Sequence, residues 1–146
     1  RIQVRAINLY GDDKMMSFSK KNMWALKDFL YHDYSHDAIL EDFTYKGDGK
    51  SAKVEFFNPF FNVKTTMVFS DIEVVLVIKG NWYDGNWCGS RKTILGLVAE
   101  DDFSYLQTYL PKCSVCSKDS LYLAFQMFSG DELHIVSKEV MIDVVK

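Results

Sequence analysis

Proline, glycine and cysteine are all scarce in this chain, and each scarcity excludes a class of protein. Two prolines and eight glycines among 146 residues are too few for a disordered or low-complexity chain. Three cysteines, an odd number, do not make the disulfide framework of a small secreted domain. This cysteine usage favours a reducing compartment, so we expect the protein to be cytoplasmic.

Long apolar runs and an excess of positive charge are also missing. The apolar stretch 72–78 is broken by Glu73 and closed by Lys79, far short of the roughly 18 residues that a membrane span needs. The formal net charge is −3, whereas nucleic-acid-binding domains normally carry a clustered basic excess. We therefore expect neither a membrane nor a nucleic acid as a partner.

Apolar and aromatic residues are plentiful instead. Hydrophobic residues make up 48% of the chain and aromatic residues 15%. A chain of this length and composition can bury a substantial core, and its size is that of one domain. We expect residues 1–146 to form a single domain.

Alternating apolar and polar residues predict strands along most of the chain. The clearest signal is a hairpin between 121–125 and 133–136, because a Gly-Asp turn at 129–132 separates two apolar runs. A second hairpin, with Asp48-Gly49 in its turn, joins 39–45 to 52–56. In the first strand of that hairpin, residues 39, 41, 43 and 45 would share one face. Further β segments are predicted at 2–10, 63–69, 72–78, 93–99 and 140–145, with a break near 137–139.

Helical spacing of apolar residues appears in two places. Ser19 has the properties of an N-cap, and apolar residues recur at helical intervals from Lys20 to Tyr31. A shorter helix is predicted over 103–110, where Pro111 would end it. The predicted fold is α+β: a mainly antiparallel sheet of about six to eight strands, one N-terminal amphipathic helix packed on it, and a short second helix.

Cysteines and histidines raise the question of a metal site. Cys113 and Cys116 form a C-x-x-C motif, and Cys88 with a histidine would complete a tetrahedral zinc set. Structural zinc sites usually carry two such pairs, and a redox motif opens a helix after a strand. We interpret these residues as loop cysteines and predict no metal and no other cofactor. The pairs His32-Asp33 and His36-Asp37 are interpreted as a polar helix-to-strand connection.

Two segments are candidates for binding a ligand or partner. The Gly/Asn-rich loop 80–90 carries Trp82, Tyr83, Asp84 and Trp87. These rings either cap an end of the sheet or stack on a sugar or a peptide, because large rigid aromatics supply contact area at low entropic cost. The acidic run Glu100-Asp101-Asp102 is the second candidate, as a surface for a basic partner.

Three short patterns carry a resemblance to a known group of proteins. They are Ser35-His36-Asp37-Ala38-Ile39, Met67-Val68-Phe69 before Asp71-Ile72, and Ser129-Gly130 before Leu133-His134-Ile135. This layout, over most of 32–145, resembles small bacterial α+β proteins of unknown function, some of them grouped with the immunity proteins of polymorphic toxin systems. The resemblance implies a curved antiparallel sheet with a helix packed against it and no enzymatic activity.

The residues agree with a non-enzymatic role, because no nucleophile, base and orienting group occur in a context that would bring them together. We predict a protein-binding module of the immunity type, with a protein such as a basic toxin as its partner. The alternative is a carbohydrate- or peptide-binding domain that uses the Trp82/Trp87 loop.

Overall fold

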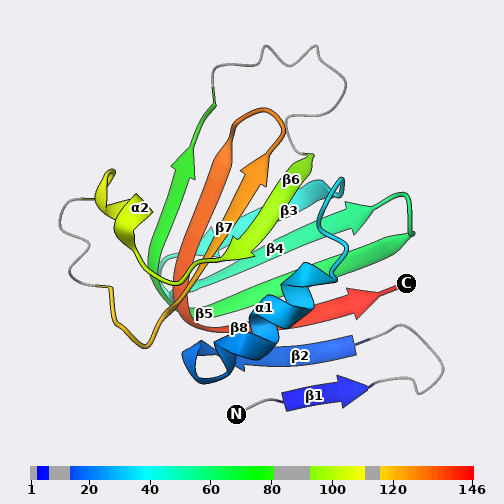
Figure 1. The fold of residues 1–146 in the computed structure, drawn as a ribbon, viewed down its shortest axis with the longest axis horizontal. Helices are drawn as coiled ribbons and strands as arrows, with labels where there is room; N and C mark the ends of the chain where they lie inside the picture. The colour runs from blue at the N-terminus through cyan, green and yellow to red at the C-terminus, as the bar shows by residue number, and fades with distance from the viewer. Residues whose placement is uncertain (1–2, 7–13, 81–92, 111–115) are drawn as a thin grey trace.

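A computed structural model describes residues 3–6, 14–80, 93–110 and 116–146 (Figure 1). The chain forms a mainly antiparallel sheet with two short helices, so the predicted α+β class is confirmed. The elements are β1 Gln3–Ala6, β2 Lys14–Ser19, α1 Met23–Tyr31, β3 Ile39–Lys46, β4 Ser51–Asn58, β5 Val63–Ile78, β6 Ile94–Ala99, α2 Ser104–Gln107, β7 Leu121–Met127 and β8 Glu132–Val145.

The two longest strands, β5 and β8, form the spine of the eight-stranded sheet. They pair with each other along their whole length, and their outer neighbours change halfway. β8 pairs first with β7 and then with β2, and β5 pairs with β4 through its first half. As a result, β6 and β7 stand at a steep angle to β1–β4 (Figure 1).

The change of direction occurs inside each spine strand. Asp71 has a φ of 55°, and the β5–β8 register shifts between Ile72 and Val74. One residue in the left-handed region turns the strand without ending the hydrogen-bonded ladder. The prediction of two separate strands at 63–69 and 72–78 is therefore wrong, as is the predicted break near 137–139, since β8 runs through it.

The main core lies on the concave side of this bend. It combines fully buried residues from both halves of the sheet, among them Phe56, Phe69, Phe125 and Ile135, with Leu26 of α1. α1 packs against β6 and β2, which belong to different halves of the sheet. The helix therefore covers the opening between the two halves (Figure 1).

α1 differs from its prediction in three ways. Two strands precede it, so it is not N-terminal. The first predicted residues form a 3-10 turn, Lys20–Asn22, in which the backbone N–H of Ser19 donates to Asn22 Oδ1 at 2.7 Å. Trp24 is 67% exposed although it belongs to the predicted apolar set. The helix is consequently shorter and less cleanly amphipathic than its spacing indicates.

A β-bulge changes which residues of β3 face the core. The β3–β4 register shifts between Leu40 and Asp42, so Leu40 and Phe43 pair with the buried Phe56 and Val54 and pack against the core, while Ile39 lies on the other face and is exposed. Phe43 and Tyr45 share a face as predicted, but the extra residue of the bulge inverts the alternation, so Ile39 does not share that face. The hairpin itself is confirmed.

The C-terminal hairpin forms as predicted. β7 and β8 pair across a turn in which Gly130 has a φ of 88°, a conformation that glycine adopts without strain. β6 pairs with β7, and an isolated bridge between Ile39 and Thr93 connects the start of β6 to β3. In the described part of the chain no helix has the length and apolar character to cross a membrane.

Candidate functional site

The convex face of the β5–β8–β7 half carries a second, smaller apolar cluster, which we call the α2 cluster. Its buried members are Leu106, Tyr122 and Val136. Neighbouring residues of a strand point to opposite faces of the sheet. Tyr122 and Val136 therefore lie on the face opposite to that of the main-core residues Leu123 and Ile135. The half-buried members packed around them are Val74, Leu76, Phe103, Leu110, Cys116 and Ala124.

A chain of polar side chains runs along this face from the interior to the surface. Tyr122 Oη lies 2.7 Å from His134 Nδ1, and His134 Nε2 lies 2.7 Å from Glu132 Oε1. The hydroxyl of Tyr105 donates to both oxygens of Glu132, at 2.9 and 3.1 Å. Tyr109 Oη completes the chain, 3.3 Å from Tyr105 Oη.

The β7–β8 register explains why these side chains meet. Ala124 pairs with His134 and Tyr122 pairs with Val136, so Tyr122 and His134 are diagonal neighbours on one face. Glu132 stands two residues before His134 on the same strand and therefore on the same face. The fixed geometry of two paired strands thus holds the imidazole between a phenol and a carboxylate.

The hydrogen-bond inventory assigns the protons in this chain. An ionised carboxylate only accepts, so His134 Nε2 carries the proton that Glu132 receives. The Tyr122 hydroxyl lies 2.7 Å from Nδ1 and donates to it when the imidazole is neutral. The hydrogen bond with Tyr109, partial burial and the carboxylate of Glu132 raise the pKa of Tyr105 above its ordinary 10.0, so this phenol stays protonated.

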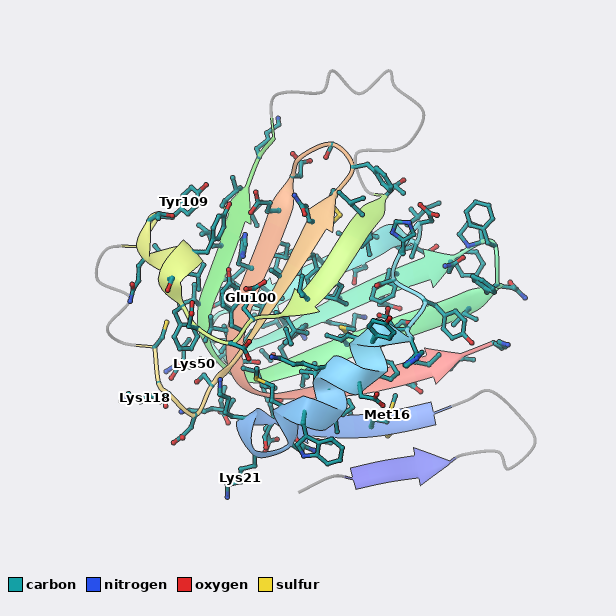
Figure 2. The ribbon with its side chains drawn as sticks, in the orientation of Figure 1. Met16, Lys21, Lys50, Glu100, Tyr109 and Lys118 are labelled. Carbon is teal, nitrogen blue, oxygen red and sulfur yellow. The ribbon has the colours of Figure 1, made fainter. Side chains whose placement is uncertain are left out.

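A hollow of about 250 Å³ opens beside the exposed end of this row of hydrogen-bonded side chains. We call it the α2 hollow; the residues that line it are Val98, Glu100, Tyr105, Tyr122, Ala124, Phe125, Gln126, Glu132 and His134. Among these described lining residues, two are carboxylates and none is a lysine or an arginine. Figure 2 shows Glu100 beyond the end of β6 and Tyr109 on the outer side of α2.

The order hydroxyl, imidazole, carboxylate is also that of a nucleophile, its base and an orienting acid. Here the hydroxyl end is the closed end, because Tyr122 is 2% exposed and the ring of Phe103 stacks on it with centroids 6.0 Å apart. His134 is 3% exposed. The Glu132 carboxylate and Tyr105 face the hollow, and their hydrogen bonds with His134 and with each other fix them in place.

The three residues of the predicted acidic run, Glu100, Asp101 and Asp102, have three different roles in the structure. Glu100 lines the α2 hollow. Asp101 forms an exposed ion pair with Lys27 of α1. Asp102 Oδ1 accepts from the backbone N–H of Ser104 at 2.9 Å, which starts α2 and lowers the pKa of that carboxyl. Only Glu100 therefore belongs to the candidate site.

The predicted aromatic loop falls outside the described residues. Trp82, Tyr83, Asp84 and Trp87 are in that segment, and Cys88 and Cys113 also lie outside the described part of the chain. The described residues on either side of the loop lie next to the β7–β8 turn, since Gly80 N–H donates to Asp131 at 2.6 Å and Phe128 N–H donates to the carbonyl of Thr93 at 3.0 Å.

The structure describes one of the three cysteines, Cys116, and both of the His-Asp pairs of the sequence. Cys116 packs half-buried in the α2 cluster, and no three His, Cys, Asp or Glu side chains of the described residues gather as a metal site. His32 and His36 are exposed, and Nδ1 of His36 lies 2.7 Å from the carbonyl of Leu95. Burial raises the pKa of Asp33 to about 6 against the lowering effect of its hydrogen bonds with Ser35.

Two other surface features are less suited to a specific ligand. A hollow of about 620 Å³ is lined by residues that include Lys20, Lys21, Lys138, Asp119 and Glu139, charges of both signs that are exposed or half-buried. At the β4–β5 turn, Phe60 and Phe61 are 76% and 60% exposed.

Those two phenylalanines are turned outward by a buried side chain. Asn58 Oδ1 accepts from the backbone N–H groups of Phe60 and Phe61, at 2.9 and 3.3 Å. This Asx-type arrangement sets the turn locally, so the rings point away from the core.

Comparison with protein-family models, with curated proteins and with solved structures finds no match to this chain.

Proposed function

We propose that the protein is a non-enzymatic binding module that recognises a basic protein partner through the α2 hollow. One observation carries the proposal: a Tyr122–His134–Glu132 chain holds a carboxylate and Tyr105 at the mouth of a hollow whose described lining contains no lysine or arginine. Groups held in place before binding lose little conformational freedom when a partner arrives.

The size of the hollow favours a protein partner over a free metabolite. Pockets for small molecules typically measure about 300–1,000 Å³. The α2 hollow, at about 250 Å³, lies below that range and suits a single side chain of a larger partner. Val98 and Tyr105 line the hollow and are 51% and 41% exposed, and Tyr109, whose hydroxyl lies 3.3 Å from that of Tyr105, is 47% exposed next to them. Tyrosine is among the residues that most often dominate binding energy at protein interfaces.

The charge of the site supports a basic partner. Glu100 and Glu132 line the hollow, and both are carboxylates. Complementary charge accelerates association and disfavours acidic competitors. An immunity-type role, in which the partner is a basic toxin, is the specific form of this proposal. The carbohydrate- or peptide-binding role of the Trp82/Trp87 loop stays a prediction.

Capture of the partner from the source cells tests the proposal. Tagged parent protein, Glu100→Gln and Tyr109→Ala would each be purified under native conditions, and captured proteins identified by mass spectrometry. Glu41→Gln is the matched control, because Glu41 is an exposed carboxylate on β3, away from α2 (Figure 1).

The expected result is one basic protein that the parent and Glu41→Gln retain and that Glu100→Gln and Tyr109→Ala each bind at least tenfold more weakly. The affinities would be measured with the purified pair. A partner that binds all four proteins equally would refute the role of the hollow.

A further inference from the structure

We infer that the α2 hollow receives the guanidinium group of an arginine side chain of the partner. This inference rests on the proposed function and names the group that the hollow recognises. It follows from the number of acceptors in the hollow, from the aromatic ring beside them and from the volume available.

The carboxylates of the hollow retain capacity to accept hydrogen bonds. Glu132 Oε1 accepts from His134 and Tyr105, while Oε2 accepts only from Tyr105 among the described residues. A carboxylate has about four lone-pair sites, so Oε2 can accept from a ligand. The side chain of Glu100 makes no hydrogen bond or ion pair with a described residue.

Several acceptors around one small space suit a ligand with several donors in a plane. A guanidinium presents five N–H groups in a fixed fork, whereas a lysine ammonium is a compact, strongly hydrated point charge. Glu100, Glu132 and Gln126 all line the hollow, so their carboxylate and amide oxygens provide acceptors for more than one edge of the same guanidinium. An ammonium group would leave part of this acceptor set without a partner.

The aromatic wall favours arginine for a separate reason. The ring of Tyr105 lines the hollow and is fixed by its hydroxyl, which donates to Glu132 and contacts Tyr109. Its centroid lies 5.3 Å from that of His134, so the ring has a packed neighbour on one side. Guanidinium groups stack on such rings more often than ammonium groups do.

The volume agrees with one side chain. At about 30 Å³ per water molecule, a space of about 250 Å³ corresponds to roughly eight waters. The end of an arginine side chain fits within that space, whereas a folded loop or a helix does not. The remainder of the partner would then contact the exposed rim of Val98 and Tyr109.

Two short peptides that differ in one group test the inference. The probes are acetyl-Gly-Gly-Arg-Gly-Gly-amide and the same peptide with citrulline, which keeps the planar shape of arginine and removes its charge. The lysine peptide is a third probe. Binding would be followed through the backbone amide resonances of Ala124, Gln126 and His134 in ¹H–¹⁵N spectra of the full chain.

We expect saturable shifts with the arginine peptide, and binding at least tenfold weaker with citrulline and about threefold weaker with lysine. Glu132→Gln and Glu100→Gln should each weaken arginine binding about tenfold, and Glu41→Gln should leave it unchanged. If Glu132→Gln disturbs folding, its spectrum will show it, and Glu100→Gln then carries the test because that side chain bonds to no described residue.

Equal binding of the arginine and citrulline peptides, or tighter binding of the lysine peptide, would overturn the inference. This failure can be told apart from failure of the proposed function. If partner capture depends on Glu100 and Tyr109 while arginine shows no preference over citrulline, the binding face stands and the guanidinium assignment is wrong. If capture is also independent of these residues, both are wrong.

Discussion

The main core and the α2 cluster occupy opposite faces of the same strands, and they are built differently. The main core is apolar and closed, with residues such as Phe56, Phe125 and Ile135 fully buried. The α2 cluster has three buried members and places a hydrogen-bonded Tyr–His–Glu chain beside an open hollow. Alternation along β7 and β8 thus lets one pair of strands stabilise the fold on one face and present polar groups on the other.

The difference predicts a large loss of stability from truncation in the main core. Phe56→Ala should lower the free energy of unfolding by about 3–5 kcal/mol, because it removes buried apolar area and leaves a cavity. Val77→Ala, at an exposed position of β5, should change it by less than about 0.5 kcal/mol. Chemical denaturation of both variants checks the prediction, and equal losses would show that Phe56 does not lie in a closed core.

A buried carboxyl beside the main core should reveal itself in the pH dependence of stability. Asp33 Oδ2 is buried without a hydrogen-bond partner among the described residues, and burial raises the pKa of this carboxyl from 3.8 to about 6. Between these two values the folded state binds more protons than the unfolded state, so stability falls as the pH rises. The loss approaches about 3 kcal/mol above pH 6, at 1.36 kcal/mol per pKa unit.

Asp33→Asn removes this titration and tests it. Urea denaturation of parent and variant between pH 3 and pH 8 should show the parent losing stability, relative to Asp33→Asn, as the pH rises from about 4 to 6. Parallel pH profiles would mean that Asp33 is solvated in the folded protein.

The polar chain of the α2 cluster should contribute less than the main core but more than a surface hydroxyl. Tyr122→Phe leaves His134 Nδ1 buried without its 2.7 Å partner, which should cost about 1–3 kcal/mol. Tyr109→Phe removes an exposed hydroxyl and should cost less than about 0.5 kcal/mol. A smaller cost for Tyr122→Phe than for Tyr109→Phe would contradict the buried chain.

The smallest loss of stability is expected from removal of the surface ion pair that links the two regions. Lys27 of α1 pairs with Asp101, which precedes α2, and both side chains are substantially exposed. Exposed ion pairs contribute about 0.2–1 kcal/mol, and salt screens them. Lys27→Gln should therefore lower stability by less than about 1 kcal/mol at low ionic strength, with no measurable loss in 1 M salt. A larger, salt-independent loss would indicate that Lys27 acts through packing.

The sequence predicts the hairpins well because their signals are local. Gly130 and the Asp48-Gly49 turn determine where the chain reverses, and the apolar alternation beside each turn identifies the strands. β2 is not predicted, because its last residue, Ser19, has the properties of a helix N-cap and so assigns the residues before it to the approach to the helix. The sequence predicts a break at Asp71 instead of a bend, because no local signal distinguishes a bent strand from the end of a strand.

The candidate site was harder to predict than the fold. Glu100 was identified from an acidic run, but Tyr105, Tyr122, Glu132 and His134 were not. Their one local signal is the alternation of Glu132, His134 and Val136 on one face of a strand, which is equally typical of a half-buried edge. Bringing Tyr105 to Glu132 depends on how the α2 segment packs on the sheet, and that is a tertiary property.

Photo-crosslinking from Tyr109 tests the central claim, that the α2 face binds a partner, most directly. Benzoylphenylalanine would replace Tyr109, which is exposed at the rim, and in a matched protein Glu41 on β3. On irradiation in the source cells, the account predicts a covalent adduct with one basic protein from position 109 and none from position 41. The same adduct from both positions, or an adduct from position 41 alone, would contradict it.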